Sequence, residues 1–278
     1  MKIHILRCGE MRVSETVPYG NAISMKNSVR QLAEPDSRRV TLPVFCYLIE
    51  HPRGLLLVDT GWCRAISPRG DYDPGAAKAI LPGHLAAFYR PRLPAGEAID
   101  EQLAALGYRP EDLDCVILTH LDPDHVAGLR HLHGAKRIVL PEDEYFWNCR
   151  TVYRARQPQS LWIDAPIERL FYRGAADAPN RWAIDLFGDE SVRLVNVPGH
   201  TDGQAAVLLR SGGRFVLLAA DAAFSPRNWR ESITPGFGFD RGLQLRSLRW
   251  IAAKAAEPGC AAVLCSHDPG VQPHTIGI

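Results

Sequence analysis

The sequence predicts an α/β protein, because short apolar strand patterns alternate with helical patterns along most of the chain. Three of these strand patterns, Asp114–Leu118, Arg214–Ala220 and Ala261–Cys265, lead within two residues into a histidine or an aspartate. Polar groups that follow strands gather at one edge of a sheet, which is a common way to build a site on an α/β scaffold. The sequence therefore predicts a sheet protein with a polar site at the strand ends.

The first third of the chain predicts strands and one long insertion. Residues 1–13 alternate polar and apolar side chains, which is typical of a strand, and residues 14–40 are polar and irregular. Val40–Glu50 and Gly54–Asp59 are β-rich and separated by three turn residues, so they predict a hairpin. Trp62–Pro94 contains several prolines and glycines and is expected to be an irregular insertion, either a lid or a dimer contact.

The remaining elements follow from apolar periodicity and helix stop signals. Ala98–Leu106 predicts a short helix that ends at a glycine. Arg137–Leu140 predicts a strand, after which Pro141 can open a helix. Ser191–Val197 and Gln204–Leu209 predict two further strands, and residues 241–256 carry an apolar stripe at helical spacing. We expect all of residues 1–278 to form one domain.

Composition limits the classes of protein that this chain can belong to. The 278 residues are 46% hydrophobic with a formal net charge of +1, which argues against disorder and against nucleic acid or an anionic membrane as the default partner. The seven cysteines form no CxxC pair, which indicates a reducing compartment. No signal peptide or run of about 20 apolar residues is found, so we expect a cytoplasmic protein.

The densest cluster of chemically active residues is the segment THLDPDH. It places four potential metal ligands within six residues: His120, Asp122, Asp124 and His125. Alternate residues after a strand can point to one side, so His120 and Asp122 can share one ion. Asp124 and His125 begin the next helix and can reach a second ion. Imidazole and carboxylate together suit Zn, Mn, Fe or Co. The alternative is that Asp122 and Asp124 cap the following helix and the histidines are surface groups.

Distant residues extend this cluster. His200 follows a strand in the turn PGHT, Asp221 follows a very apolar strand, and His267 lies in a final SHD. An early VDTG turn contains Asp59. Taken in this order, the motifs resemble the metallo-β-lactamase fold superfamily of metal-dependent hydrolases, and the resemblance spans about residues 40–267.

The resemblance implies an αββα sandwich, in which two mixed β-sheets are covered by helices on both outer faces. It also implies two adjacent divalent ions, with zinc the first expectation. Its ligand set, carried onto this chain, is His120, Asp122 and His200 for the first ion, Asp124, His125 and His267 for the second, and Asp221 as the bridge. Asp59 is expected to be structural, orienting the ligand loop through hydrogen bonds.

Asp122 departs from the family pattern, which has a histidine at this position. Carboxylate is a harder, negatively charged ligand, so the first site is expected to favour Mn or Fe, to make bound water less acidic, or to remain without an ion. A di-iron redox branch of the superfamily also has a carboxylate here. It carries a flavodoxin-like domain, commonly in the same chain, and this chain offers no room for one, so redox chemistry is a lesser alternative.

Within the superfamily, the motifs look most like the N-acyl homoserine lactonase branch. That resemblance implies hydrolysis of a lactone or ester by a metal-bridging hydroxide, with Asp124 as ligand and proton shuttle. The branch has a tyrosine at the position of Phe224, which we expect to contact substrate without donating a hydrogen bond. Alternatives are a thioesterase, a phosphodiesterase or a non-catalytic metal-binding protein. A small-molecule ester or lactone is the expected partner, and a homodimer is left open.

Overall fold

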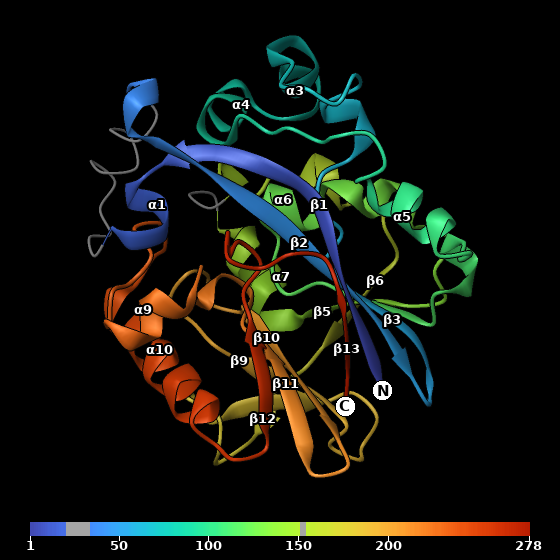
Figure 1. The fold of residues 1–278 in the computed structure, drawn as a ribbon, viewed down its shortest axis with the longest axis vertical. Coiled ribbons are helices and arrows are strands. Elements are labelled where there is room, and N and C mark those ends of the chain that lie inside the picture. The colour runs from blue at the N-terminus through green and yellow to red at the C-terminus, as the bar shows by residue number, and fades with distance from the viewer. Residues whose placement is uncertain (21–33, 151–153) are drawn as a thin grey trace.

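Two mixed β-sheets face each other at the centre of the computed structural model, which describes residues 1–20, 34–150 and 154–278 (Figure 1). The first sheet has seven strands, in the spatial order β13 (Thr275–Gly277), β1 (Lys2–Ser14), β2 (Arg39–His51), β3 (Gly54–Val58), β4 (Cys115–Ile117), β5 (Ile138–Pro141) and β6 (Ile167–Leu170). The second has six, in the order β12 (Cys260–Leu264), β11 (Arg214–Leu218), β10 (Ala205–Ser211), β9 (Val192–Asn196), β8 (Trp182–Asp185) and β7 (Arg173–Gly174).

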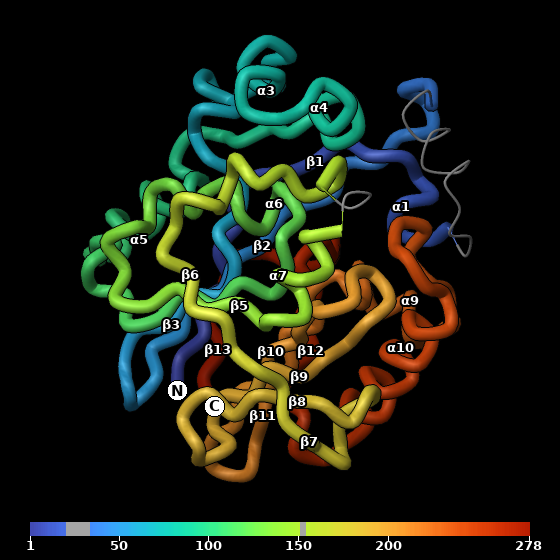
Figure 2. Tube along the Cα trace, turned by 180° about the vertical axis from the view of Figure 1, so that it is seen from behind, coloured from blue at the N-terminus to red at the C-terminus, as the bar shows by residue number. Residues whose placement is uncertain are grey.

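Helices cover the outer faces of both sheets. They are α1 (Thr16–Tyr19), α3 (Pro74–Ile80), α4 (Gly83–Tyr89), α5 (Ile99–Ala105), α6 (Pro123–Val126), α7 (Glu142–Cys149), α9 (Pro226–Arg230) and α10 (Arg241–Ala255). Figure 2 shows α5, α6 and α7 beside the first sheet, and α9 and α10 beside the second. The predicted αββα sandwich is therefore confirmed. No helix among the described residues has the length and hydropathy needed to cross a membrane.

Side-chain alternation along β2 shows how the layers form. Phe45, Tyr47 and Ile49 point into the core between the two sheets, whereas Cys46 and Leu48 point into the core beneath the outer helices. Successive residues of a strand face opposite sides, so a strand buried on both faces is apolar throughout. This pattern explains why the β-rich segment Val40–Glu50 predicted the strand that the structure has as β2.

The sheets place several strand ends on one side of the molecule. β3, β4 and β5 run parallel, and β11 runs parallel to β12. The residues that follow β3, β4, β11 and β12 therefore emerge from the same edge of the sandwich. This arrangement brings segments from the whole length of the chain to one place.

The prediction of an irregular segment at 62–94 is wrong in part. This segment contains α3 and α4, which pack with Trp62 against the outer part of β1 (Figure 1). The carboxylate of Asp73 accepts hydrogen bonds from the amides of Gly75 and Ala76, and Pro74 occupies the first helical position. The prolines thus begin helices here instead of breaking them. Most of the polar segment predicted at 14–40 lies outside the described residues, which resume at 34.

Candidate metal centre

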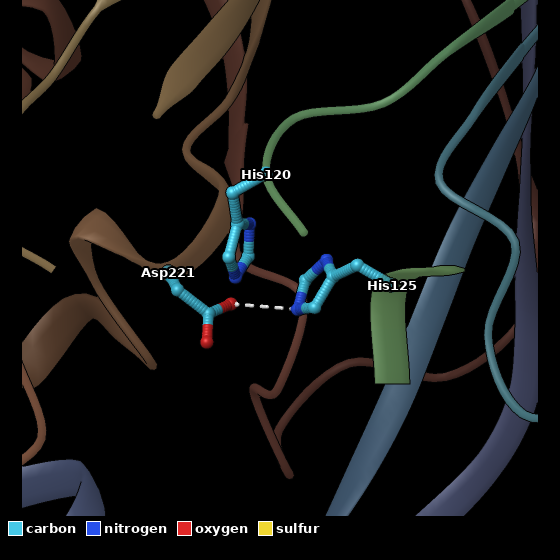
Figure 3. A group of neighbouring side chains, drawn as sticks. All are labelled: His120, His125 and Asp221. Carbon is cyan, nitrogen blue, oxygen red and sulfur yellow. Dashed lines mark ion pairs between the residues drawn. The ribbon is translucent and has the colours of Figure 1, made fainter. Parts of the chain in front are cut away.

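The fold brings all seven predicted metal ligands together at the shared sheet edge, and every one of them is buried. In each of three overlapping groups, the ligand atoms lie within 4.8 Å of one another. The groups are His120, Asp122 and His200; Asp124, His125 and His267; and His120, His125 and Asp221. Figure 3 shows the third group, with the side chains of His120 and His125 converging on Asp221. Residues separated by up to 147 positions thus form one cluster, His120 and His267 being the most distant.

Asp59 holds the segment that carries most of these side chains. It lies at the end of β3 with a left-handed φ of 59°. Its carboxylate accepts hydrogen bonds from the amide and the hydroxyl of Thr119 and from Nδ1 of His125, each at 2.8 Å. Because Nδ1 of His125 donates to Asp59, its Nε2 carries the lone pair that faces the cluster.

Backbone and side-chain acceptors orient the other histidines in the same way. Nδ1 of His267 donates to the carbonyl of Pro43 at 2.8 Å, and Nδ1 of His200 donates to the carbonyl of Phe237 at 2.9 Å. A carbonyl oxygen can only accept, so Nε2 of both rings is the unprotonated atom in the neutral form. Burial, together with the neighbouring His125, lowers the pKa of His120 to about 4 and keeps this ring neutral.

The second predicted group has the dimensions of a metal site. Nε2 of His267 lies 3.3 Å from Oδ2 of Asp124 and 3.1 Å from Oδ1 of Asp221. Nε2 of His125 lies 3.3 Å from Oδ1 of Asp221 and 3.7 Å from Oδ2 of Asp124. Ligands about 2.1 Å from a tetrahedral zinc ion are separated by about 3.4 Å. Asp124, His125 and His267 therefore have the ligand separations of a divalent-ion site, and Asp221 borders this site through its contacts with both histidines.

Hydrogen bonding supports the same conclusion. Oδ2 of Asp124, Nε2 of His125, Nε2 of His267 and Oδ1 of Asp221 are buried and have no hydrogen-bond partner in the described parts of the chain. Buried polar atoms without partners are costly, so four of them in one cluster of ligand-type side chains indicate a site for a cation.

The first predicted group differs because a guanidinium contacts it. Asp122 stands at the N-cap position of α6 but makes no capping hydrogen bond, so the helix-capping interpretation of Asp122 is wrong. Its carboxylate instead accepts from Nε of Arg156 at 2.9 Å and from Nη2 at 2.6 Å. Nη2 also lies 2.5 Å from Nε2 of His200. Arg156 was not predicted as a site residue, because no motif surrounds it.

Arg156 changes the electrostatics of the first group. Burial alone would raise the pKa of Asp122, but the charge of Arg156 and contacts with His120 and His200 outweigh it and hold this pKa well below its usual value. The guanidinium carbon lies 4.1 Å from the centroid of the Phe237 ring, which is a cation–π contact. Asp122 and Arg156 therefore form a charged pair inside the protein.

A buried polar network, also missed from the sequence, supports the centre from the side of α7. Glu144 accepts hydrogen bonds from the amide of Leu121 at 3.1 Å, the hydroxyl of Thr201 at 2.6 Å and the amide group of Gln157 at 2.8 Å. Gln157 also donates to Asp122 at 3.1 Å. Glu144 thereby ties two ligand-bearing loops to one helix.

Phe224 lies against the second group. Its ring centroid is 4.9 Å from that of His267, and its side chain is buried. Asn228 accepts a hydrogen bond from the amide of Phe224 and holds the loop that follows Asp221. This position makes Phe224 an apolar wall beside the centre.

A family model described as "Metallo-beta-lactamase superfamily" matches residues 39–267, which is most of the chain. The chain belongs to this superfamily. Its similar curated relatives include the N-acyl homoserine lactonase AttM of Agrobacterium fabrum, 29% identical over 237 residues and 82% of each chain. An N-acyl homoserine lactonase from a Bacillus species is 30% identical over 241 residues and 84% of each chain.

Solved structures share the fold of this metallo-β-lactamase superfamily member. An N-acyl homoserine lactone hydrolase with N-hexanoyl-L-homoserine at its catalytic metal centre aligns with a TM-score of 0.73 and 21% identity, covering 96% of this chain and 93% of that one. The dizinc quorum-quenching lactonase AidC aligns with a TM-score of 0.63 and 17% identity, covering 98% and 88%. At these identities the structural likeness concerns the fold.

Proposed function

We propose that this protein is a metal-dependent hydrolase that opens lactone rings, with N-acyl homoserine lactones as the leading substrate class. The observation that carries the proposal is the convergence of four unpartnered buried ligand atoms in a superfamily member whose relatives are named as lactonases. We further propose zinc as the ion, since two imidazoles and two carboxylates suit it. Cytoplasmic location and a homodimer remain predictions.

Asp124, His125, His267 and Asp221 would hold the ion. Bound there, a divalent ion supplies Lewis acidity and makes a nearby water more acidic. Asp124 would have the further role of accepting the proton that the attacking water gives up and passing it to the leaving alkoxide as the ring opens. In the metal-free protein, burial raises the pKa of Asp124, and the charges of His125 and His267 oppose this shift.

Two neighbouring groups would shape the reaction without ligating the ion. Phe224 excludes water from the side of His267 and offers apolar surface to the acyl part of a substrate. By accepting from Nδ1, Asp59 fixes the tautomer of neutral His125 in which the lone pair of Nε2 is aimed at the ion.

A substrate panel on protein of known metal content tests the proposal. Lactones of graded acyl length, a thioester and a phosphodiester are compared in one assay, before chelation, after it and after zinc is returned. We expect lactone opening that chelation abolishes and zinc restores. His267→Ala should lose activity, whereas His274→Ala, at an exposed histidine near the C-terminus, should keep it. Turnover of the thioester or phosphodiester alone would favour those alternatives instead.

A further inference from the structure

We propose that the guanidinium of Arg156 takes the place of the first of the two expected metal ions, so that the chain binds one divalent ion. That ion would lie in the second group, with Asp124, His125, His267 and Asp221. The inference rests on the metal-binding part of the proposed function and deepens it, because it specifies what provides the second positive charge of the centre.

The single lone pair of His200 already accepts a hydrogen bond from Arg156. Nδ1 of His200 donates to the carbonyl of Phe237, so its only lone pair is on Nε2. Nη2 of Arg156 lies 2.5 Å from that nitrogen, and a guanidinium nitrogen can only donate. An imidazole lone pair serves one partner at a time. While Arg156 is in this position, His200 has no lone pair to offer an ion.

Both oxygens of the Asp122 carboxylate already accept hydrogen bonds. Oδ1 accepts from Nε of Arg156 at 2.9 Å and from Gln157 at 3.1 Å, and Oδ2 accepts from Nη2 at 2.6 Å. Oδ2 of Asp122 lies only 3.1 Å from Nε2 of His200. An ion bound by both atoms would therefore compete with Nη2 for their lone pairs.

The guanidinium is held too firmly to be a mobile gate. Nη1 donates to the carbonyl of His200 at 3.0 Å, and the group stacks on the Phe237 ring. The Arg156 side chain is only 12% exposed. Moving it aside would leave the Asp122 carboxylate buried without its partner, which is strongly unfavourable. A second ion would have to displace a cation that is already paired.

The distribution of unpartnered atoms agrees with a single ion. In the described part of the chain, the three ligand atoms of the second group and Oδ1 of Asp221 lack a hydrogen bond, whereas in the first group only Nε2 of His120 does.

Metal stoichiometry tests this inference without reference to activity. The folded protein is stripped of metal, titrated calorimetrically with Zn²⁺ alone, and analysed for bound metal after desalting. We expect about one tightly bound ion per chain for the unmodified protein and about two for Arg156→Ala, in which Asp122 and His200 regain free lone pairs beside the free Nε2 of His120. Arg154→Ala removes an exposed arginine two residues away and should leave the count unchanged.

A second variant covers the case in which Arg156→Ala fails to fold around an unpaired Asp122. Arg156→Ala combined with Asp122→His removes both charges and supplies a neutral ligand, and it should also bind about two ions. Two tight ions in the unmodified protein would overturn the inference, as would a folded Arg156 variant that still binds one. Lactone turnover by the unmodified protein is measured separately. If this protein binds two ions and opens lactones, the proposed function stands and only the single-ion inference fails. If it binds one ion and opens no lactone, only the proposed function fails.

Discussion

The substitution Asp59→Asn distinguishes the contribution of the Asp59 carboxylate to metal affinity from its contribution to the stability of the fold. The Asp59 carboxylate is buried and accepts three hydrogen bonds, two from Thr119 and one from His125. Asparagine keeps the size of the side chain and tolerates the left-handed φ of 59°. It replaces one acceptor oxygen with an NH₂ donor, however, and it removes the negative charge beside His125.

The structure sets the expected magnitude. If the amide oxygen takes the place of Oδ2, the Thr119 hydroxyl and His125 keep their acceptor, and the Thr119 amide faces a donor. One unsatisfied buried donor costs about 1–3 kcal/mol of unfolding free energy. Loss of the carboxylate that orients a metal-ligating histidine lowers metal affinity by about 10–100-fold. We therefore expect Asp59→Asn to lower the unfolding free energy of the metal-free protein and, separately, to lower the affinity for metal.

Two measurements separate these effects. Urea unfolding of the metal-free protein gives the change in unfolding free energy, and competition with a chromophoric chelator gives the zinc affinity. Asp114→Asn is the matched control, because Asp114 accepts from the amide of Leu55 and pairs with Lys136 at the surface, far from any predicted ligand in the fold. We expect it to cost less than about 1 kcal/mol and to leave zinc affinity unchanged. Zinc affinity in Asp59→Asn equal to that of the unmodified protein would refute the role given to Asp59.

Two further substitutions test the surroundings of the centre. Phe224→Tyr adds a hydroxyl donor beside His267. We expect kcat for lactones to rise by about tenfold or more, because the hydroxyl can donate to the developing oxyanion. A folded variant with an unchanged kcat would contradict this expectation. Gly199→Ala should lower the unfolding free energy by more than about 2 kcal/mol, because Gly199 has a φ of 128° and an added Cβ would lie 2.4 Å from the amide of Gln244. Gly212→Ala, at a φ of 55° with open space around it, should cost only about 1 kcal/mol in the same urea measurement, and equal losses would disprove the steric argument.

Strong local patterns were sufficient for the elements that position the site. The strands predicted at Arg214–Ala220 and Ala261–Cys265 are found at Arg214–Leu218 and Cys260–Leu264. Both are short apolar runs bounded by turn residues; β11 is buried after Arg214, whereas β12 is a partly buried edge strand. The order of motifs along the chain then indicated the sandwich, which the structure confirms.

Weak patterns were decided by tertiary contacts. β6 (Ile167–Leu170) contains Glu168 and Arg169, and it forms a strand because it pairs in parallel with β5 (Ile138–Pro141) at the sheet edge. An edge strand that is partly exposed needs little apolar periodicity, so its sequence does not distinguish it from a loop.

The candidate site divides in the same way. The spacing from His120 to His125 and the position of Asp221 after a strand are local properties, and the sequence by itself determined them. The partner of Asp122 is not local, because Arg156 lies 34 residues further along the chain, in a segment with no recognisable motif. A guanidinium meets a carboxylate only when the fold brings their segments together and excludes water around them. Only the tertiary structure could therefore show that Asp122, which stands where the family pattern has a histidine, is paired with the positively charged guanidinium of Arg156.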